Sequence, residues 1–181
     1  MFVFGAKDAV IVIDMLNDFV REGAPLEVPA ARQIIPALRE TLAKARAAGV
    51  PVVYVCDSHA PNDPEFDIWP PHAVTATKGA AIVDELTPEP TDRIVLKHRV
   101  LGFFRDGLAQ VLESLGIERV ILTGILTDIC VFFGAAGAYE LGYKCVALSD
   151  CVAALTEDDH QWALRQMKRI LAVELAEGAG D

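Results

Sequence analysis

The stretch that decides the fold is RVILTGILTDICVFFGAAGAYEL, residues 119–141. Its first part, 119–124, is a largely apolar run, which predicts a strand that is buried on both faces. Residues 129–141 are also mostly apolar and are followed by Gly142, a pattern that predicts a helix and its end. A buried strand that leads directly into a helix is the repeating unit of parallel α/β sheets.

The same alternation of strands and helices extends over the rest of the chain. Further strands are predicted at 9–14, 51–57, 93–97 and 144–149, with a short sixth at 172–176, and further helices at 30–49, 105–115 and 157–170. Pro36 lies inside the first helical pattern, so that helix either begins near Pro36 or is kinked there. Residues 58–91 contain six prolines and are expected to be an irregular loop, either functional or disordered, with a short helix at 76–86.

The order of these elements predicts one domain over residues 1–181. We expect a three-layer α/β/α fold around a central, mostly parallel sheet of five or six strands. A formal net charge of −10 without a basic stripe argues against a nucleic-acid partner. No run reaches the roughly 18 uncharged apolar residues of a membrane span, and no cleavage pattern follows the N-terminal apolar run. We therefore expect a cytoplasmic protein with no membrane partner.

Four consecutive strands are each followed by a polar or reactive residue. The first strand ends at Asp14, the second at Asp57, and the third at Lys97, while the fourth leads through a short loop to Cys130. Because parallel sheets bind ligands at the carboxyl ends of their strands, we expect these groups to meet at one edge of the sheet.

Cys130 is the candidate nucleophile. Its predicted place at a helix N-terminus favours the thiolate, and Lys97 would add a positive charge. Asp14 could take the thiol proton and later give it to a leaving amine, while backbone N–H groups near Cys130 could bind an oxyanion. Each residue alone has a simpler explanation, such as packing, a loop hydrogen bond or solvation; the joint arrangement favours catalysis. The other cysteines, Cys56, Cys145 and Cys151, form no CxxC pair and are expected to be packing residues.

A possible metal site precedes the third strand. Asp57 and His59 form a D-x-H pair on an extended strand end, and His72 follows in the segment WPPH. One carboxylate and two imidazoles suit zinc, with manganese or iron as alternatives, and they leave coordination positions open for water or substrate.

Three segments carry a resemblance to a known family. AVIVIDMLNDF, IVLKHRVLGFF and ILTGILTDICV resemble the isochorismatase-like cysteine hydrolases, which include nicotinamidases and N-carbamoylsarcosine amidases. The resemblance covers roughly residues 8–176 and implies a catalytic triad of Asp14, Lys97 and Cys130. It also implies a cis peptide bond between Ile125 and Leu126, with the N–H groups of Leu126 and Cys130 as the oxyanion hole.

Within that family, the D-x-H and W-P-x-H segments are most similar to those of nicotinamidases. The resemblance implies that Asp57, His59 and His72 bind a divalent metal that holds the pyridine nitrogen of the substrate. It also implies that Phe19 and Trp69 flank the ring, although ordinary loop packing would explain both residues as well. Two departures keep other substrates open: Ala73 stands where many nicotinamidases have cysteine, and the KHR sequence at Lys97 also occurs in family amidases of other specificity.

The interpretation from sequence is a cysteine amidohydrolase that converts nicotinamide to nicotinic acid and ammonia. The alternatives are a metal-independent amidase of a carbamoyl or ureido substrate, an inactive ligand-binding relative, or a redox protein that uses Cys130. The partner is expected to be a small-molecule amide, and the chain is expected to form a homo-oligomer. A fourth metal ligand, Glu65 or Asp67, stays open.

Four other polar residues are given supporting roles. Asp18 is expected to brace the first loop or to orient Lys97, and Asp128 to cap the helix of Cys130. His98 and His160 are expected to be structural or solvated.

Overall fold

The computed structural model describes residues 2–99 and 107–178. Its strands are β1 (Asp8–Ile13), β2 (Val52–Asp57), β3 (Arg93–Lys97), β4 (Arg119–Ile125), β5 (Lys144–Ala153) and β6 (Glu174–Ala176). Its helices are α1 (Asn17–Val20), α2 (Ala31–Ala47), α3 (Leu108–Ser114), α4 (Cys130–Glu140) and α5 (Glu157–Ile170), with short 3₁₀ turns η1 (Pro64–Asp67) and η2 (Asp84–Leu86). The alternation expected from the sequence is therefore confirmed.

The strands form one six-stranded sheet in the order β3-β2-β1-β4-β5-β6. Every pairing between neighbours is parallel. The chain therefore starts in the middle of the sheet, builds one half outward to β3, and then crosses back to β4 beside β1. Strand order reverses between β1 and β4, and in sheets of this kind the ligand site lies at the carboxyl ends of the strands at such a reversal.

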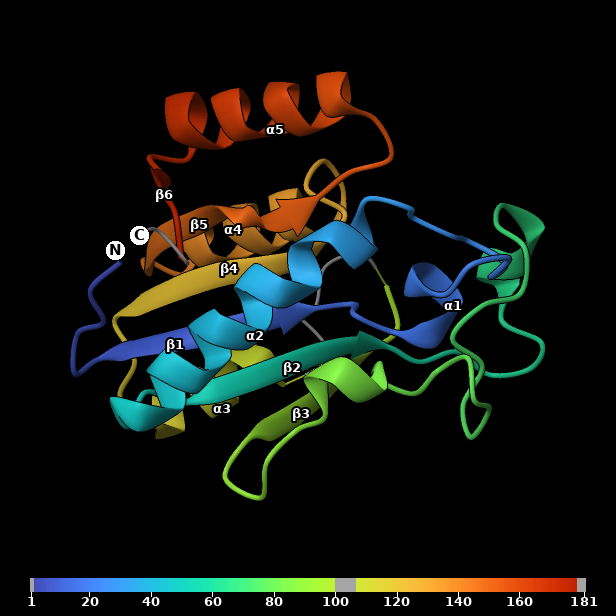
Figure 1. Ribbon diagram of the computed structural model, residues 1–181, viewed down its shortest axis with the longest axis horizontal. Helices are drawn as coiled ribbons and strands as arrows, with labels where there is room; N and C mark the ends of the chain where they lie inside the picture. The colour runs from blue at the N-terminus through green and yellow to red at the C-terminus, as the bar shows by residue number, and fades with distance from the viewer. Residues whose placement is uncertain (1, 100–106, 179–181) are drawn as a thin grey trace.

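The sheet is the middle of three layers, as expected (Figure 1). Helix α2 packs on one face through an apolar stripe that includes Ile35, Leu38 and Leu42. Helices α3, α4 and α5 cover the other face, where Leu112 and Val131 lie in the second apolar cluster. Strands β1 and β2 are buried along their whole length, which explains their continuous apolar sequences.

Four elements differ in detail from the sequence prediction. Helix α2 begins at Ala31 and continues through Pro36, because packing of its apolar stripe on the sheet outweighs the helix-breaking effect of proline. The helix expected at 76–86 is only the turn η2, and β5 runs beyond its predicted end to Ala153. Helix α3 begins at Leu108; residues 105 and 106 of the predicted helix lie outside the described part of the chain.

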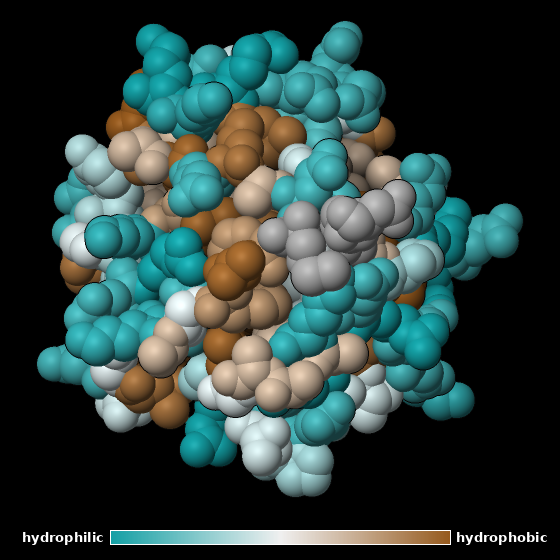
Figure 2. All heavy atoms as spheres, turned by 60° about the vertical axis from the view of Figure 1, so that its left-hand side comes forward, coloured by the Kyte–Doolittle hydropathy of each residue, from teal (hydrophilic) through white to brown (hydrophobic). Residues whose placement is uncertain are grey.

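The surface agrees with the acidic composition. Figure 2 brings forward the side of the molecule that carries both termini, where hydrophilic side chains surround smaller apolar areas. Across residues 2–99 and 107–178, no helix is long and apolar enough to span a membrane.

Candidate active site

The carboxyl ends of four strands bring the expected reactive residues together. Asp14 follows β1, Asp57 ends β2, Lys97 ends β3, and Cys130 begins α4 just after β4. Asp14 has a φ of 53°, a left-handed conformation that non-glycine residues seldom adopt and that is found preferentially at functional sites. Its backbone N–H donates to the carbonyl of Val55 at 2.9 Å, which ties the turn after β1 to the neighbouring strand.

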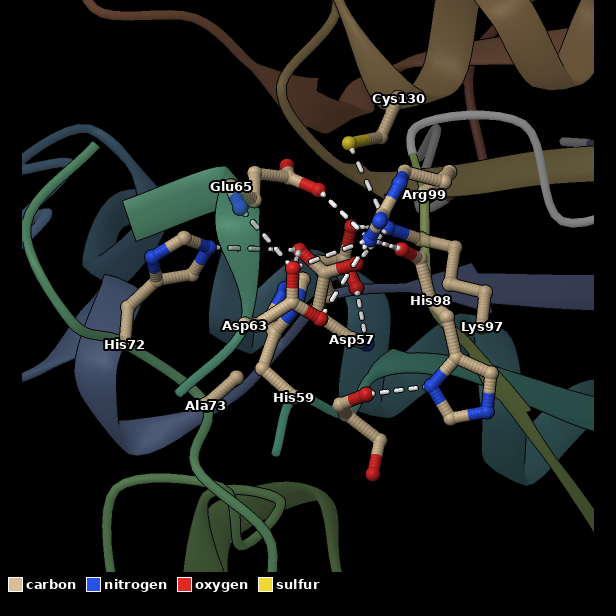
Figure 3. A network of polar contacts seen from close by, with 12 residues as sticks. Asp57, His59, Asp63, Glu65, His72, Ala73, Lys97, His98, Arg99 and Cys130 are labelled. Carbon is tan, nitrogen blue, oxygen red and sulfur yellow. Dashed lines mark hydrogen bonds and ion pairs between the residues drawn. The ribbon is translucent and has the colours of Figure 1, made fainter. Parts of the chain in front are cut away.

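Lys97 is the centre of this cluster. Its side chain is 1% exposed, and its Nζ lies 2.8 Å from Asp14 Oδ2 and forms a close ion pair with Asp57 Oδ1. The same Nζ approaches the Cys130 Sγ at 3.7 Å (Figure 3). Asp14 is also held by the backbone N–H of Asp57, which donates to its Oδ1 at 2.8 Å. One buried ammonium group therefore contacts both carboxylates and the thiol, as the triad prediction requires.

The protonation states follow from burial and from these contacts. Burial raises the pKa of Asp14 to about 6, and the nearby Asp57 charge acts in the same direction. Burial also raises the pKa of the Cys130 thiol well above its usual value, although Lys97 opposes this effect. Burial acts to lower the pKa of Lys97, but the neighbouring acidic groups, led by Asp14, outweigh it and raise that pKa. Asp14 can thus exchange a proton near neutral pH beside a fixed cation.

Asp57 is the more acidic of the two carboxylates. Burial acts to raise its pKa, but the charge of Lys97 and the nearby His59 ring outweigh burial, and the pKa is lowered. The two carboxylates are therefore unequal: Asp57 stays ionised, and Asp14 is the one suited to carry a proton.

The segment between β4 and α4 has the backbone that the family resemblance implies. The peptide bond between Ile125 and Leu126 is cis, as expected. Within the described residues, no acceptor contacts the N–H of Leu126 or of Cys130. Both donors belong to the segment that carries the nucleophile, so they are free to bind an oxygen at this point.

Two supporting predictions have different outcomes. Asp18 braces the first loop, since its Oδ2 accepts from the N–H of Ala73 at 2.9 Å. Asp128 does not cap α4, and that expectation is wrong: Ile129 holds the cap position without a side-chain hydrogen bond. Asp128 Oδ1 is instead buried without a hydrogen-bond partner in the described part of the chain.

A second cluster adjoins the lysine cluster through Asp57. The free oxygen of this carboxylate, Oδ2, lies 4.0 Å from Nε2 of His59 and 3.9 Å from Nε2 of His72. Candidate ligand atoms of the three residues all lie within 4.8 Å of one another, and all three residues are buried. The predicted metal-binding set is therefore assembled in space.

The surroundings of the two histidines fit a metal. The Nδ1 of His59 pairs with Asp63 Oδ2 at 3.2 Å, and the Nδ1 of His72 pairs with the carbonyl of Pro70 at 2.8 Å. Such partners place the ring proton on Nδ1 and leave Nε2 as a ligand. The Nε2 of His59 is buried and has no hydrogen-bond partner among the described residues. A divalent cation would satisfy this orphaned nitrogen.

Both clusters border one cavity of about 320 Å³. The described residues that line it are Asp14, Phe19, Pro25, Leu26, Glu27, Val28, Asp57, Glu65, Trp69, His72, Ile125, Leu126, Ile129, Cys130 and Leu155. Phe19 and Trp69 are thus in the cavity wall, as expected, and the Phe19 ring lies 5.5 Å from the His72 ring. Of the two candidates for a fourth ligand, Glu65 reaches the cavity; it also pairs with Arg99 at 3.3 Å.

Sequence reasoning missed several contributors to the site. Asp63 orients His59, and Phe66 packs with ring centroids 5.5 Å from His59 and 5.7 Å from His72. The loop after α1 supplies Leu26 and Val28 to the cavity wall. The only sequence signal for Asp63 was its position, four residues after the suspected metal ligand His59. The apolar wall residues had none, because their sequence resembles ordinary loop packing.

The comparison with protein families shows to which family the chain belongs. A model described as the isochorismatase domain matches residues 8–177. The chain belongs to the isochorismatase family. It is a hydrolase of this family, and its six-stranded α/β fold is the one that solved members share.

Individual relatives in this family act on different amides. The chain is 32% identical to a ureidoacrylate amidohydrolase, RutB, of Rhizobium rhizogenes, over 87% of this chain and 75% of that protein. The structure of the nicotinamidase PncA from Bacillus subtilis has a TM-score of 0.89 at 32% identity, over 94% of this chain and all of that chain (100%). An N-carbamoylsarcosine amidase from Thermoplasma acidophilum has a TM-score of 0.88 at 32% identity, over 97% and 98%.

A pyrazinamidase of the isochorismatase family has been solved in complex with zinc. This protein, from Pyrococcus horikoshii, has a TM-score of 0.89 at 30% identity, over 94% of this chain and 99% of that chain.

Proposed function

We propose that this hydrolase acts on nicotinamide or a similar neutral aromatic amide through a cysteine thioester. The observation that carries the proposal is that one cavity with an aromatic wall is bordered by Cys130 and by Asp57 and His72, which form a buried cluster with His59. An attacked carbonyl and a ring nitrogen on the same small substrate could therefore be held at the same time. A flat ring would stack on the aromatic side chains of that wall.

The chemistry assigned to the triad follows from the contacts around Lys97. Asp14 takes the proton of the Cys130 thiol, and the ammonium group of Lys97 stabilises the resulting negative charges. The thiolate attacks the amide carbonyl, and the N–H groups of Leu126 and Cys130 hold the oxyanion. Ammonia leaves with the proton from Asp14, which gives a thioester. Water then adds to the thioester as Asp14 accepts one of its protons. The bond to sulfur breaks, Asp14 returns that proton to the sulfur of Cys130, and the acid is released with the thiol restored.

The metal is assigned to the histidine cluster. Asp57, His59 and His72 would hold zinc, with manganese or iron as alternatives, and Glu65, which borders the same cavity, is the candidate for a further ligand. A bound divalent ion would supply a Lewis-acid contact for the ring nitrogen of the substrate. Asp63 and Pro70 keep the two imidazoles in the orientation that this role needs.

The second candidate is a metal-independent amidase of a carbamoyl or ureido substrate, which the relatives of those activities favour. Ureidoacrylate and carbamoylsarcosine each carry a carboxylate. The described lining of the cavity includes the carboxyl side chains of Asp14, Glu27, Asp57 and Glu65 but no lysine or arginine. The described lining thus offers no cation to pair with a substrate carboxylate, whereas a neutral amide needs none, and this favours the nicotinamide type.

The test is ammonia release from nicotinamide by the purified protein, before and after chelation, with zinc, manganese or iron added back. The expected result is turnover that chelation removes and one of these metals restores. A panel with carbamoylsarcosine and ureidoacrylate is assayed in parallel. Turnover of a carbamoyl or ureido substrate that survives chelation, without release from nicotinamide, would replace this proposal with the second candidate.

A homo-oligomer remains part of the proposal. Helices α4 and α5 expose the apolar side chains of Phe133, Tyr139 and Trp162, which would be covered in an interface. Sedimentation velocity of the purified chain tests this expectation, and a monomer at all concentrations would contradict it.

A further inference from the structure

A histidine outside the cavity contacts the loop that carries the nucleophile. His160 lies in the first turn of α5, and its Nδ1 is 2.9 Å from the hydroxyl of Thr127. Thr127 is fully buried and stands directly after Leu126. From the other side, the N–H of Thr127 donates to the carbonyl of Ala153 at 2.9 Å, at the end of β5. Thr127 is therefore held by hydrogen bonds from two different elements.

The next residue of the loop, Asp128, has no comparable contact among the described residues. Asp128 Oδ1 is buried and has no hydrogen-bond partner in the described chain. Burial raises the pKa of this carboxyl, and the charge of Asp159 acts in the same direction. The contact of this loop with α5 is therefore made through the Thr127 hydroxyl.

Helix α5 does not depend on His160 to stay in place. Its buried side chains Ala163, Leu164 and Met167 anchor it against the rest of the fold. The Thr127 contact is a polar addition at the end of the helix nearest the nucleophile loop. A residue needed only to dock α5 would be expected on that apolar face instead.

We propose that His160 is a positioning residue, which fixes the segment 126–130 and so directs the N–H groups of Leu126 and Cys130 at the oxyanion. This inference rests on the proposed role of those two donors. His160 is not among the described residues that line the cavity, so it acts through Thr127 and not on the substrate. Loss of its hydrogen bond should affect the transition state, in which the oxyanion is formed, more than substrate binding.

The experiment compares His160→Ala with His160→Asn, whose side-chain amide can replace the Nδ1 contact. Gln161→Ala is the matched control, because Gln161 is an exposed neighbour on α5 whose side chain donates to Glu157 of the same helix. Ammonia release is measured at saturating metal with nicotinamide. Amide hydrogen exchange of residues 126–130 is measured on the same proteins and needs no substrate.

For His160→Ala we expect kcat to fall about 10- to 100-fold with KM within about twofold, because small displacements of catalytic groups are costly. Exchange at 126–130 should be about fivefold faster, the effect of one lost hydrogen bond. His160→Asn should restore most of the lost kcat and most of the slow exchange. Gln161→Ala should change neither quantity. Unchanged exchange at 126–130 would overturn the inference whatever the substrate. If the parent does not cleave nicotinamide, the proposed function is refuted, but faster exchange in His160→Ala would still support the contact. The kcat comparison would then use a carbamoyl or ureido amide as substrate. An unchanged kcat of His160→Ala on that substrate would overturn the positioning role.

Discussion

Replacing Lys97 with methionine should reveal how strongly the buried carboxylates depend on one cation. Lys97 is 1% exposed and pairs with both Asp14 and Asp57, so Lys97→Met leaves two buried carboxylates without their counter-ion. Removing one partner of a buried ion pair costs about 3–5 kcal/mol. At roughly 2–4 °C per kcal/mol for a chain of this length, the thermal midpoint should fall by roughly 6–20 °C.

The pH dependence of Lys97→Met sharpens this prediction. The pKa of Asp14 is already raised in the folded protein to about 6, above its value of 3.8 in a free chain. The folded state therefore binds this proton more tightly than the unfolded state, and its contribution to stability is lost as the pH rises through the folded pKa. Without Lys97, the pKa of Asp14 should rise further. The difference in thermal midpoint between the parent and Lys97→Met should consequently become smaller as the pH falls from 8 to 6.

The assay is thermal unfolding followed by circular dichroism for the parent, Lys97→Met and the matched control Lys7→Met. Lys7 pairs with Glu118 at the surface, where its side chain is 62% exposed, so its loss should change the midpoint little. Adding Asp57→Asn to Lys97→Met removes one unpaired charge and should recover part of the loss. A midpoint for Lys97→Met within about 1 °C of the parent, at every pH, would refute the buried counter-ion interpretation.

Three further predictions address catalysis and the metal. Cys130→Ala should lower ammonia release at least about 10³-fold while the circular dichroism spectrum and the thermal midpoint stay close to those of the parent; retained turnover would exclude the thioester. The kcat/KM of the parent should fall as the pH drops below about 6, because Asp14 then carries a proton and cannot accept one from the thiol; a flat profile from pH 5 to 8 would contradict its role as base. His72→Ala should weaken zinc binding in equilibrium dialysis by at least about tenfold, whereas the control His98→Ala, which lies outside the cluster, should bind as the parent does.

The convergence of the candidate site residues could be predicted because the strand ends of a parallel sheet meet at one edge. Asp14 follows β1, while Asp57 and Lys97 end β2 and β3, and that pattern needs only the alternation of apolar runs to be recognised. The fold could be predicted for the same reason, since β1 and β2 are buried on both faces and have no polar residue in their interiors. Pro36 shows the limit of local rules, because packing of α2 on the sheet outweighed its preference to end a helix.

Contacts between side chains from distant segments were beyond the sequence. Nothing in the sequence near Asp128 indicates that its carboxylate is buried without a partner instead of capping α4. The contact between His160 and Thr127 joins residues 33 positions apart, and it depends on where α5 packs. Such pairs follow from tertiary geometry, which periodicity does not encode at single-residue precision.

The two oxygens of Asp57 make the lysine cluster and the histidine cluster one electrostatic unit. Oδ1 pairs with Lys97, while Oδ2 faces His59 and His72. With both carboxylates ionised, the cluster of two acids and one lysine carries an excess negative charge, which opposes a thiolate at Cys130. A cation on Oδ2 would offset that excess and would also weaken the hold of Asp57 on the ammonium group of Lys97. In the proposed function, the histidines would therefore bear on the reactivity of Cys130 as well as on substrate binding, because Asp57 belongs to both clusters.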